Sequence, residues 1–225
     1  MTRVILALGL AAITLVSVDD EISIGKQADA QVRKDVPVFR DAETQAYVRS
    51  LGDRLVEHVA GPRYPYSFAI ADYREINAFA LPGGPVWIQR AVLQTATNES
   101  QVAGVFAHEI SHISERHAAG QLSGVIVANW GLGLLGAVLG NGGGASTAQM
   151  AAALLTNGVF LKFSRDDESE ADRVGLQLMR KAGWDGRGMV ELFEILRREQ
   201  SRDPGSVETF FSTHPSPQDR IVRLQ

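Results

Sequence analysis

The chain has 225 residues, a formal net charge of −4 and no cysteine. This length supports one domain with a substantial core, and the acidic balance argues against nucleic-acid binding, which needs a basic surface. The lack of cysteine excludes disulfide bonds, a thiolate nucleophile and a cysteine-based zinc site. Any bound metal must therefore be held by nitrogen and oxygen atoms.

The N-terminus resembles an export signal. Arg3 precedes the uncharged residues 4–18, a run shorter than the roughly 20 residues that span a bilayer and suited to the apolar part of a signal peptide. No small-x-small cleavage site follows it. We therefore expect residues 1–18 to be a signal peptide or an uncleaved N-terminal anchor, and residues 19–225 to form one domain.

The first half of the chain predicts two helices and a small β element. Residues 21–36 and 41–60 are expected to be helical, the second because its apolar residues recur at helical spacing. Residues 64–72 have β character, and residues 77–89 predict two short strands around a Pro-Gly-Gly turn.

The second half is predicted to be helical. One helix is expected over residues 99–119, with Asn98 or Thr97 as its N-cap. Residues 118–161 carry no charge, and a Gly-rich stretch divides them into two apolar arms. Further helices are expected over residues 164–182 and 188–200. The pattern indicates an α+β fold that is mostly α.

A capping box supports one of these helices, because Ser164 is followed three residues later by Asp167. Gly183 suits the end of the same helix. Near the C-terminus Ser216 is a second candidate N-cap, with Pro217 in the first turn.

The helix over residues 99–119 carries the motif HEISH. His108 and His112 lie one turn apart on the same face, so both imidazoles can hold one metal ion. Glu109 projects to the side, where it can act as general base toward a water on the metal. Apolar flanks surround these polar residues, and burying them without a partner would cost free energy. The motif therefore predicts zinc.

A third ligand is needed, because catalytic zinc sites use three protein ligands. Glu115 lies too far along the helix to reach the same ion and is expected to be solvated, and His117 is expected to point away as an ordinary histidine. The acidic start of the helix from residue 164 is the better source. Glu168 is the predicted third ligand, and Asp172 is the predicted acceptor for the other N–H of a ligand imidazole.

The stretches HEISH, SRDDESEAD and HPSP, with NAFALPGG upstream, resemble the HtpX/BepA/LoiP-like zinc endopeptidases of metallopeptidase family 48. That family also includes the CAAX prenyl protease and the Oma-type mitochondrial proteases. The match runs from about residue 21 to the C-terminus in the family's order and spacing. It implies a gluzincin-like fold, with two site helices beside a small sheet and a helical hairpin between the ligand motifs.

The resemblance also implies the activity. It predicts one zinc ion per chain on His108, His112 and Glu168, with Glu109 as the base. The substrates would be unfolded or misfolded envelope polypeptides, hydrolysed within the chain, and the location would be periplasmic or at the periplasmic side of a membrane. The alternative is a catalytically quiet, zinc-binding chaperone-like or scaffold protein on the same fold.

Further roles follow from the resemblance alone. Asn77, Phe79 and Ala80 would line an edge strand that holds the substrate extended through its backbone. His214 resembles the family histidine that approaches the zinc, where it would either stabilise the oxyanion or ligate the metal and restrain the enzyme. Residues 118–161 would form a packed hairpin that acts as a lid. A hairpin that enters the membrane is the open alternative.

Overall fold

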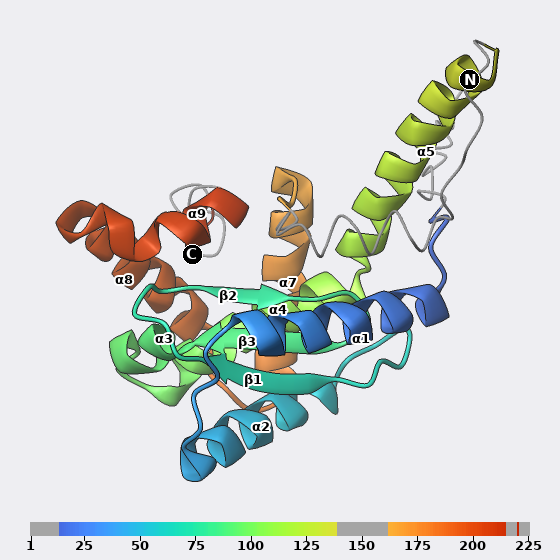
Figure 1. The fold of residues 1–225 in the computed structure, drawn as a ribbon. Coiled ribbons are helices and arrows are strands. Elements are labelled where there is room, and N and C mark those ends of the chain that lie inside the picture. The colour runs from blue at the N-terminus through green and yellow to red at the C-terminus, as the bar shows by residue number, and fades with distance from the viewer. Residues whose placement is uncertain (1–13, 139–161, 215–219, 221–225) are drawn as a thin grey trace, which may run out of the picture.

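The computed structural model describes residues 14–138, 162–214 and 220, and for residues 128–138 it describes the backbone alone. Within these residues, helices surround a three-stranded sheet (Figure 1), so the predicted α+β, mostly α class is confirmed. The Gly-rich stretch at residues 141–147 and the predicted helix start at Ser216 lie outside the described residues, as does nearly all of the second apolar arm. The lid therefore remains a prediction.

Two helices come first, as predicted. α1 (Val18–Asp35) begins earlier than expected because Ser17 and Asp20 form a capping box. Val16 is buried against the start of a later helix, and the Leu15 backbone N–H donates to Ser123 Oγ at 2.8 Å. Folded contacts thus begin inside the range predicted as a leader, and the boundary at residue 18 stays a prediction.

The sheet has the strand order β1-β3-β2. α2 (Ala42–Val56) leads into β1 (Ser67–Ala71), which runs parallel to β3 (Pro85–Gln89). β2 (Ala78–Ala80) pairs with β3 in the antiparallel sense. Within the described residues no strand pairs with the outer side of β2, so β2 is an edge strand. Gly83 and Gly84, in the predicted turn, have φ values of 75° and 133°, which favour glycine.

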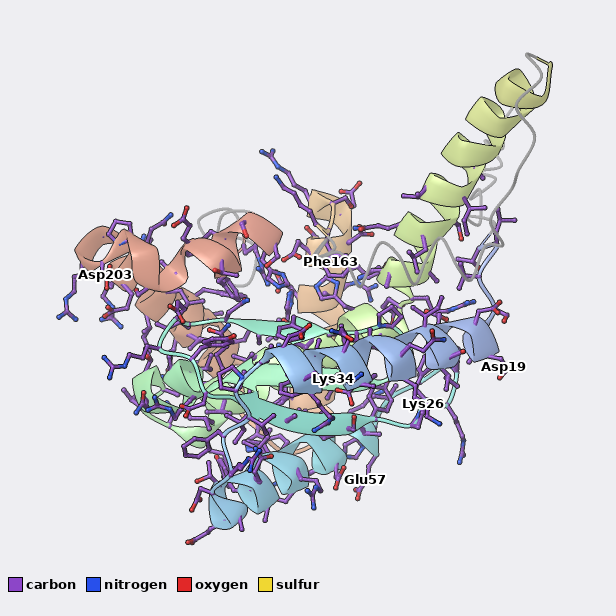
Figure 2. The ribbon with its side chains drawn as sticks, viewed as in Figure 1. Asp19, Lys26, Lys34, Glu57, Phe163 and Asp203 are labelled. Atoms are coloured by element: carbon purple, nitrogen blue, oxygen red, sulfur yellow. The ribbon has the colours of Figure 1, made fainter. Side chains whose placement is uncertain are left out.

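Each face of the sheet packs on different helices. Phe68 and Ile88 point into the main core, which α2 contributes to, while Trp87 packs toward α1. The period-two alternation of side chains produces this division. α1 crosses the front of the sheet in Figure 1, with Lys26 and Lys34 exposed on its outer side (Figure 2).

The central helix is α4 (Glu99–Ser114), which follows the short helix α3 (Arg90–Thr95) that the sequence did not predict. Asn98 is its N-cap and accepts a hydrogen bond from the Gln101 backbone N–H at 3.1 Å. Every residue from Gln101 to Ser114 is buried, because α4 contacts the sheet and several other helices at once. A helix that is apolar nearly all round needs such a position.

The single helix predicted over residues 99–119 is wrong. α4 ends at Ser114, and α5 (His117–Val138) begins after Arg116, whose φ is +60°. Arg116 Nε donates to Glu21 Oε2 at 2.8 Å, and Arg116 Nη2 donates to the Val16 carbonyl at 2.6 Å. These bonds hold a conformation that costs a non-glycine residue free energy.

α5 extends away from the body of the domain (Figure 1). None of the helices in the described part of the chain is long and apolar enough to cross a membrane.

The C-terminal half supplies helices that pack on α4. α7 (Arg165–Lys181) starts with the predicted capping box of Ser164 and Asp167, and Gly183 follows it with φ +82°. α8 (Arg187–Arg202), the 3-10 turn η1 (Pro204–Val207) and α9 (Glu208–Thr213) complete the described fold. α4 packs closely on both α7 and α8, so side chains from all three helices can meet.

Candidate metal centre

α4 brings the two histidines of the HEISH motif together. His108 Nε2 and His112 Nε2 lie 3.0 Å apart, and both side chains are almost fully buried. Burial lowers the pKa of His112 well below its usual value, so its imidazole is neutral. A neutral imidazole has a lone pair for a metal.

α7 adds the predicted third ligand. The Glu168 carboxylate is 2% exposed, and its two oxygens lie 3.5 Å from His112 Nε2 and 3.5 Å from His108 Nε2. Burial alone would raise the pKa of Glu168, but the surrounding imidazoles, above all His214, hold it well below the usual range. Glu168 is therefore a carboxylate and a good oxygen ligand.

His214 follows α9 and completes the group. Its Nδ1 lies 2.9 Å from Glu168 Oε1 and 3.4 Å from His108 Nε2. Burial lowers the pKa of His214, but the charge and hydrogen bond of Glu168, together with the charge of Glu109, outweigh burial and raise it. His214 and Glu168 therefore form an ion pair, which a metal would replace by displacing the proton.

These four side chains fit a zinc ion. One ligand atom from each of His108, His112, Glu168 and His214 lies within 4.8 Å of the other three, and all four residues are buried. Three imidazole nitrogens and one carboxylate oxygen are ligands that zinc accepts in four-coordinate sites. A bound cation would also account for the burial of these polar side chains, because burying polar or charged groups costs free energy unless a partner compensates for the lost water.

Glu109 lies beside this group without joining it. The side chain is 1% exposed, and neither carboxylate oxygen has a hydrogen-bond partner among the described residues. Its Oε1 is 3.6 Å from His214 Nε2. A buried carboxylate with free lone pairs next to a metal site is available to take a proton.

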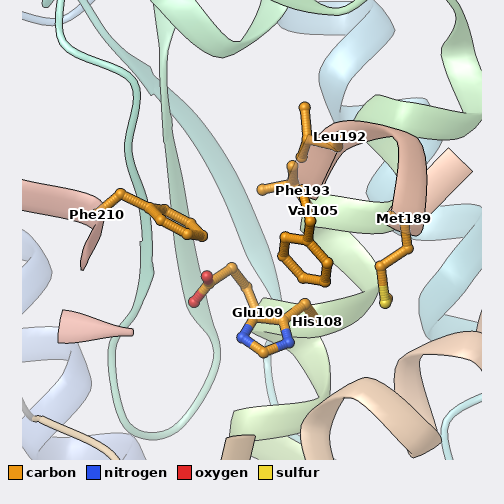
Figure 3. A pocket seen from close by; sticks show the side chains of 8 residues that line it. Val105, His108, Glu109, Met189, Leu192, Phe193 and Phe210 are labelled. Atoms are coloured by element: carbon orange, nitrogen blue, oxygen red, sulfur yellow. The ribbon is translucent and has the colours of Figure 1, made fainter. Parts of the chain in front are cut away.

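A narrow pocket opens at Glu109 and His108 (Figure 3). Its walls are apolar side chains from α4, α8 and α9, namely Val105, Met189, Leu192, Phe193 and Phe210. The pocket can therefore exclude water from the side on which Glu109 lies.

Asp172 contacts the outer nitrogen of His108. Asp172 Oδ1 lies 3.1 Å from His108 Nδ1, and its role as acceptor for this ring stays a prediction. Arg220 donates from Nε to Asp172 Oδ2 at 2.8 Å and from Nη2 to Asp172 Oδ1 at 2.6 Å. Burial raises the pKa of Asp172, but the hydrogen bonds and charges of Arg220 and His108 together outweigh burial and lower that pKa to about 2.

The sequence reasoning missed Arg220. Its Nη1 also lies 2.8 Å from Glu168 Oε2, as an ion pair without hydrogen-bond geometry, and only 3% of the residue is exposed. Arg220 thus joins the predicted ligand Glu168 to Asp172. The signal in the sequence is its position six residues after His214, at the end of the stretch that carries HPSP.

The expectation for His117 is corrected. His117 was expected to point away from the metal-binding face, yet its Nδ1 lies 2.9 Å from His112 Nδ1 and the residue is 6% exposed. The positive φ at Arg116 ends α4 and changes the chain direction, and His117 then lies against His112 in the last turns of α4. Glu115, by contrast, is exposed as expected.

The residues predicted to hold substrate lie on or next to β2, which contacts α4. Asn77 is 1% exposed, and its Oδ1 has no hydrogen-bond partner within the described ranges. Phe79 stacks on Trp87, with 6.2 Å between ring centroids, and Ala80 is half-buried. Their roles in binding stay predictions.

Comparisons with known proteins agree with this geometry. The sequence profile of Peptidase family M48 matches residues 42–225. The beta-barrel assembly-enhancing protease of Escherichia coli (strain K12) is 33% identical over 224 residues, which cover 96% of this chain and 45% of that protein. The mitochondrial metalloendopeptidase OMA1 of Schizosaccharomyces pombe is 35% identical over 149 residues, or 66% of this chain and 42% of that protein.

The metalloprotease YcaL of Escherichia coli (strain K12) is 26% identical over 161 residues, which cover 72% of this chain and 61% of that protein. The chain spans about half the length of these relatives.

Proposed function

The chain belongs to peptidase family M48, a family of zinc metalloproteases, and on this premise we propose that it hydrolyses peptide bonds within unfolded or misfolded envelope polypeptides. The observation that carries the proposal is the position of Glu109. Its buried carboxylate has no hydrogen-bond partner within the residues that the structure describes, and it adjoins four side chains that can hold one metal ion. A purely structural zinc site has no use for such a base.

His108, His112 and Glu168 would hold the zinc ion, and Asp172 would fix the His108 ring through Nδ1. When bound, zinc would supply a Lewis acid that polarises the scissile carbonyl and makes water more acidic. A Glu109 oxygen would accept the proton of the attacking water and then deliver it to the leaving amine. The apolar pocket walls beside Glu109 would keep other water away from this proton transfer.

We propose β2 as the surface that holds the peptide. An edge strand offers backbone N–H and C=O groups to an extended chain, with little demand on its side chains. The Oδ1 of Asn77 is buried next to β2 without a hydrogen-bond partner in the described part of the chain, and it would accept an N–H from the same peptide once the site opens. Recognition through the backbone suits a protease whose substrates share an unfolded state.

His214 would restrain the enzyme in this closed state, in which the metal-binding group is buried. It occupies the fourth place in the metal-binding group, and His108, Glu109, His112, Glu168 and His214 are each between 1% and 3% exposed. A peptide cannot reach such a site. We therefore propose that His214 leaves the group when substrate enters, and that its Nε2–H then faces the developing oxyanion.

Location and substrate class rest on two supports. The apolar residues 4–18 after Arg3 predict export, and the relative from Escherichia coli is named a beta-barrel assembly-enhancing protease. We accordingly place the protein in the periplasm or at the periplasmic side of a membrane. Misfolded outer-membrane proteins are then the substrates to test first.

The test compares the wild type with Glu109→Gln and with Glu115→Gln, an exposed glutamate at the end of the same helix. Zinc content and cleavage of unfolded casein are measured for each. We expect Glu109→Gln to keep its zinc and to lose about 10²- to 10⁴-fold in cleavage rate, the usual contribution of a general base.

Glu115→Gln should match the wild type, and a chelator should stop the wild type. Equal cleavage by Glu109→Gln and the wild type would overturn the mechanism. A wild type that binds zinc and cleaves nothing would favour the quiet zinc-binding alternative.

A further inference from the structure

The two predicted ligand histidines have different neighbours at their outer nitrogens. His108 Nδ1 faces Asp172 at 3.1 Å, an arrangement common for metal-bound imidazoles. His112 Nδ1 instead faces a third imidazole, because His117 Nδ1 lies 2.9 Å away. His117 is nearly buried and is the first residue of α5, so the turn at Arg116 sets its position.

The protons of this pair can be assigned by elimination. If His112 Nε2 binds a metal it carries no proton, because a ligand nitrogen must offer its lone pair. A neutral imidazole has one proton, so that proton is on His112 Nδ1. The contact at 2.9 Å then requires His117 Nδ1 to accept, which leaves the His117 proton on Nε2.

The surroundings of His117 Nε2 fit a donor. This nitrogen lies 3.5 Å from Glu170 Oε2 and 3.9 Å from Asp167 Oδ1. It has no hydrogen-bond partner at its present orientation among the described residues, and these two carboxylates are its ion-pair partners there. Both acids come from the start of α7, the helix that supplies Glu168. An acceptor nitrogen would be repelled in this position.

We propose that His117 is a positioning residue for the metal, which accepts the hydrogen bond of His112 Nδ1–H and so fixes the tautomer and ring orientation of that ligand. This inference rests on the proposed zinc function. Phe163 supports the same orientation from another side, since its ring stacks on the His112 ring with 3.9 Å between centroids and 21° between planes. Phe163 is labelled in Figure 2, just before α7.

The orientation has a functional consequence. An acceptor at His112 Nδ1 makes Nε2 a stronger ligand, and loss of such an outer partner commonly costs about 10- to 100-fold in metal affinity. His117 also joins α5 to the metal site, because the residue that begins α5 holds a ligand. Movement of the base of α5 would therefore change the geometry of His112.

The experiment measures zinc affinity by chelator competition for the wild type, His117→Leu, His117→Asn and His58→Leu. Leucine removes the acceptor and keeps an apolar volume, whereas the asparagine Oδ1 can stand near the place of Nδ1 and accept the same hydrogen bond. His58 is half-buried, follows α2 and is not a member of the metal-binding group, so it controls for loss of a histidine.

We expect His117→Leu to bind zinc about 10- to 100-fold more weakly than the wild type, with His117→Asn and His58→Leu close to the wild type. Equal affinity of His117→Leu and the wild type would overturn the inference and leave the proposed function intact. Equal weakening in both His117 variants would also overturn it, because the loss would then come from packing. A wild type without zinc affinity would overturn the proposed function itself.

A second measurement needs no variant and covers the case in which His117→Leu does not fold. Long-range 1H–15N correlation spectra of the zinc-loaded wild type report which nitrogen of each histidine carries the proton. We expect the proton of His112 on Nδ1 and that of His117 on Nε2. A proton on Nδ1 of His117 would refute the assignment.

Discussion

Replacing Arg220 by methionine tests whether the cation holds the acidic side of the site together. Arg220 lies 2.6–2.8 Å from oxygens of both Asp172 and Glu168, and all three residues are at most 3% exposed. Methionine has a similar length and no charge. The substitution would therefore leave Asp172 buried without its arginine partner and Glu168 with His214 as its remaining ion-pair partner in the metal-free protein.

The expected cost follows from that geometry. Removing one partner of a buried ion pair destabilises a protein by about 3–5 kcal/mol. For a chain of this size each kcal/mol lowers the midpoint of thermal unfolding by roughly 2–4 °C. Arg220→Met should thus lower the midpoint by roughly 6–20 °C in the metal-free protein at neutral pH.

The assay is thermal unfolding followed by circular dichroism in the presence of a chelator. Arg220→Lys, which keeps the charge but loses the two-pronged contact with Asp172, should fall between the wild type and Arg220→Met. Arg202→Met is the matched control, because Arg202 pairs with Glu199 at 3.0 Å on the surface with 78% of its side chain exposed. It should change stability by less than about 0.5 kcal/mol. A midpoint for Arg220→Met within 2 °C of the wild type would refute the reasoning.

Two further predictions concern acid and packing. Because Arg220 and His108 together lower the pKa of Asp172 to about 2 against the effect of burial, this carboxylate stabilises the fold above its unfolded pKa, and the benefit declines as the pH falls toward 2. In metal-free protein the stability advantage of the wild type over Asp172→Asn should shrink by about 1 kcal/mol between pH 5 and pH 3; a constant difference would contradict this. Gly104→Ala should cost about 1–3 kcal/mol by overpacking, since its Cβ would lie 2.9 Å from Met189 Cα. A Cβ at Gly120 would meet no atom within 4 Å among the described ranges, and Gly120→Ala should stabilise α5 by about 0.5–1 kcal/mol; chemical denaturation that ranks the two variants the other way would contradict the packing account.

Much of the fold could be predicted because its signals are local. The capping box formed by Ser164 and Asp167, a signal only four residues long, marks the start of α7. The periodicity of the HEISH stretch marks α4. The family resemblance carried by HEISH, SRDDESEAD and HPSP is confirmed by the family match and the relatives. These signals suffice to place His108, His112 and Glu168 on helices that meet.

The features that the sequence did not predict depend on contacts between distant residues. Arg116 takes a positive φ because Glu21, 95 residues earlier, accepts its hydrogen bond, and no local pattern announces such a break. The break alone reverses the expectation for His117. Arg220 likewise acquires its role from Asp172, 48 residues away, and a single arginine among polar neighbours looks like any surface residue.

Zinc-edge anomalous diffraction from crystals of the zinc-loaded protein tests the central claim most directly. We predict one peak per chain, bonded to His108 Nε2, His112 Nε2 and an oxygen of Glu168, at about 2.0–2.2 Å for each bond. An ion bound elsewhere, or one that leaves the Glu168 carboxylate without a bond, would contradict the account.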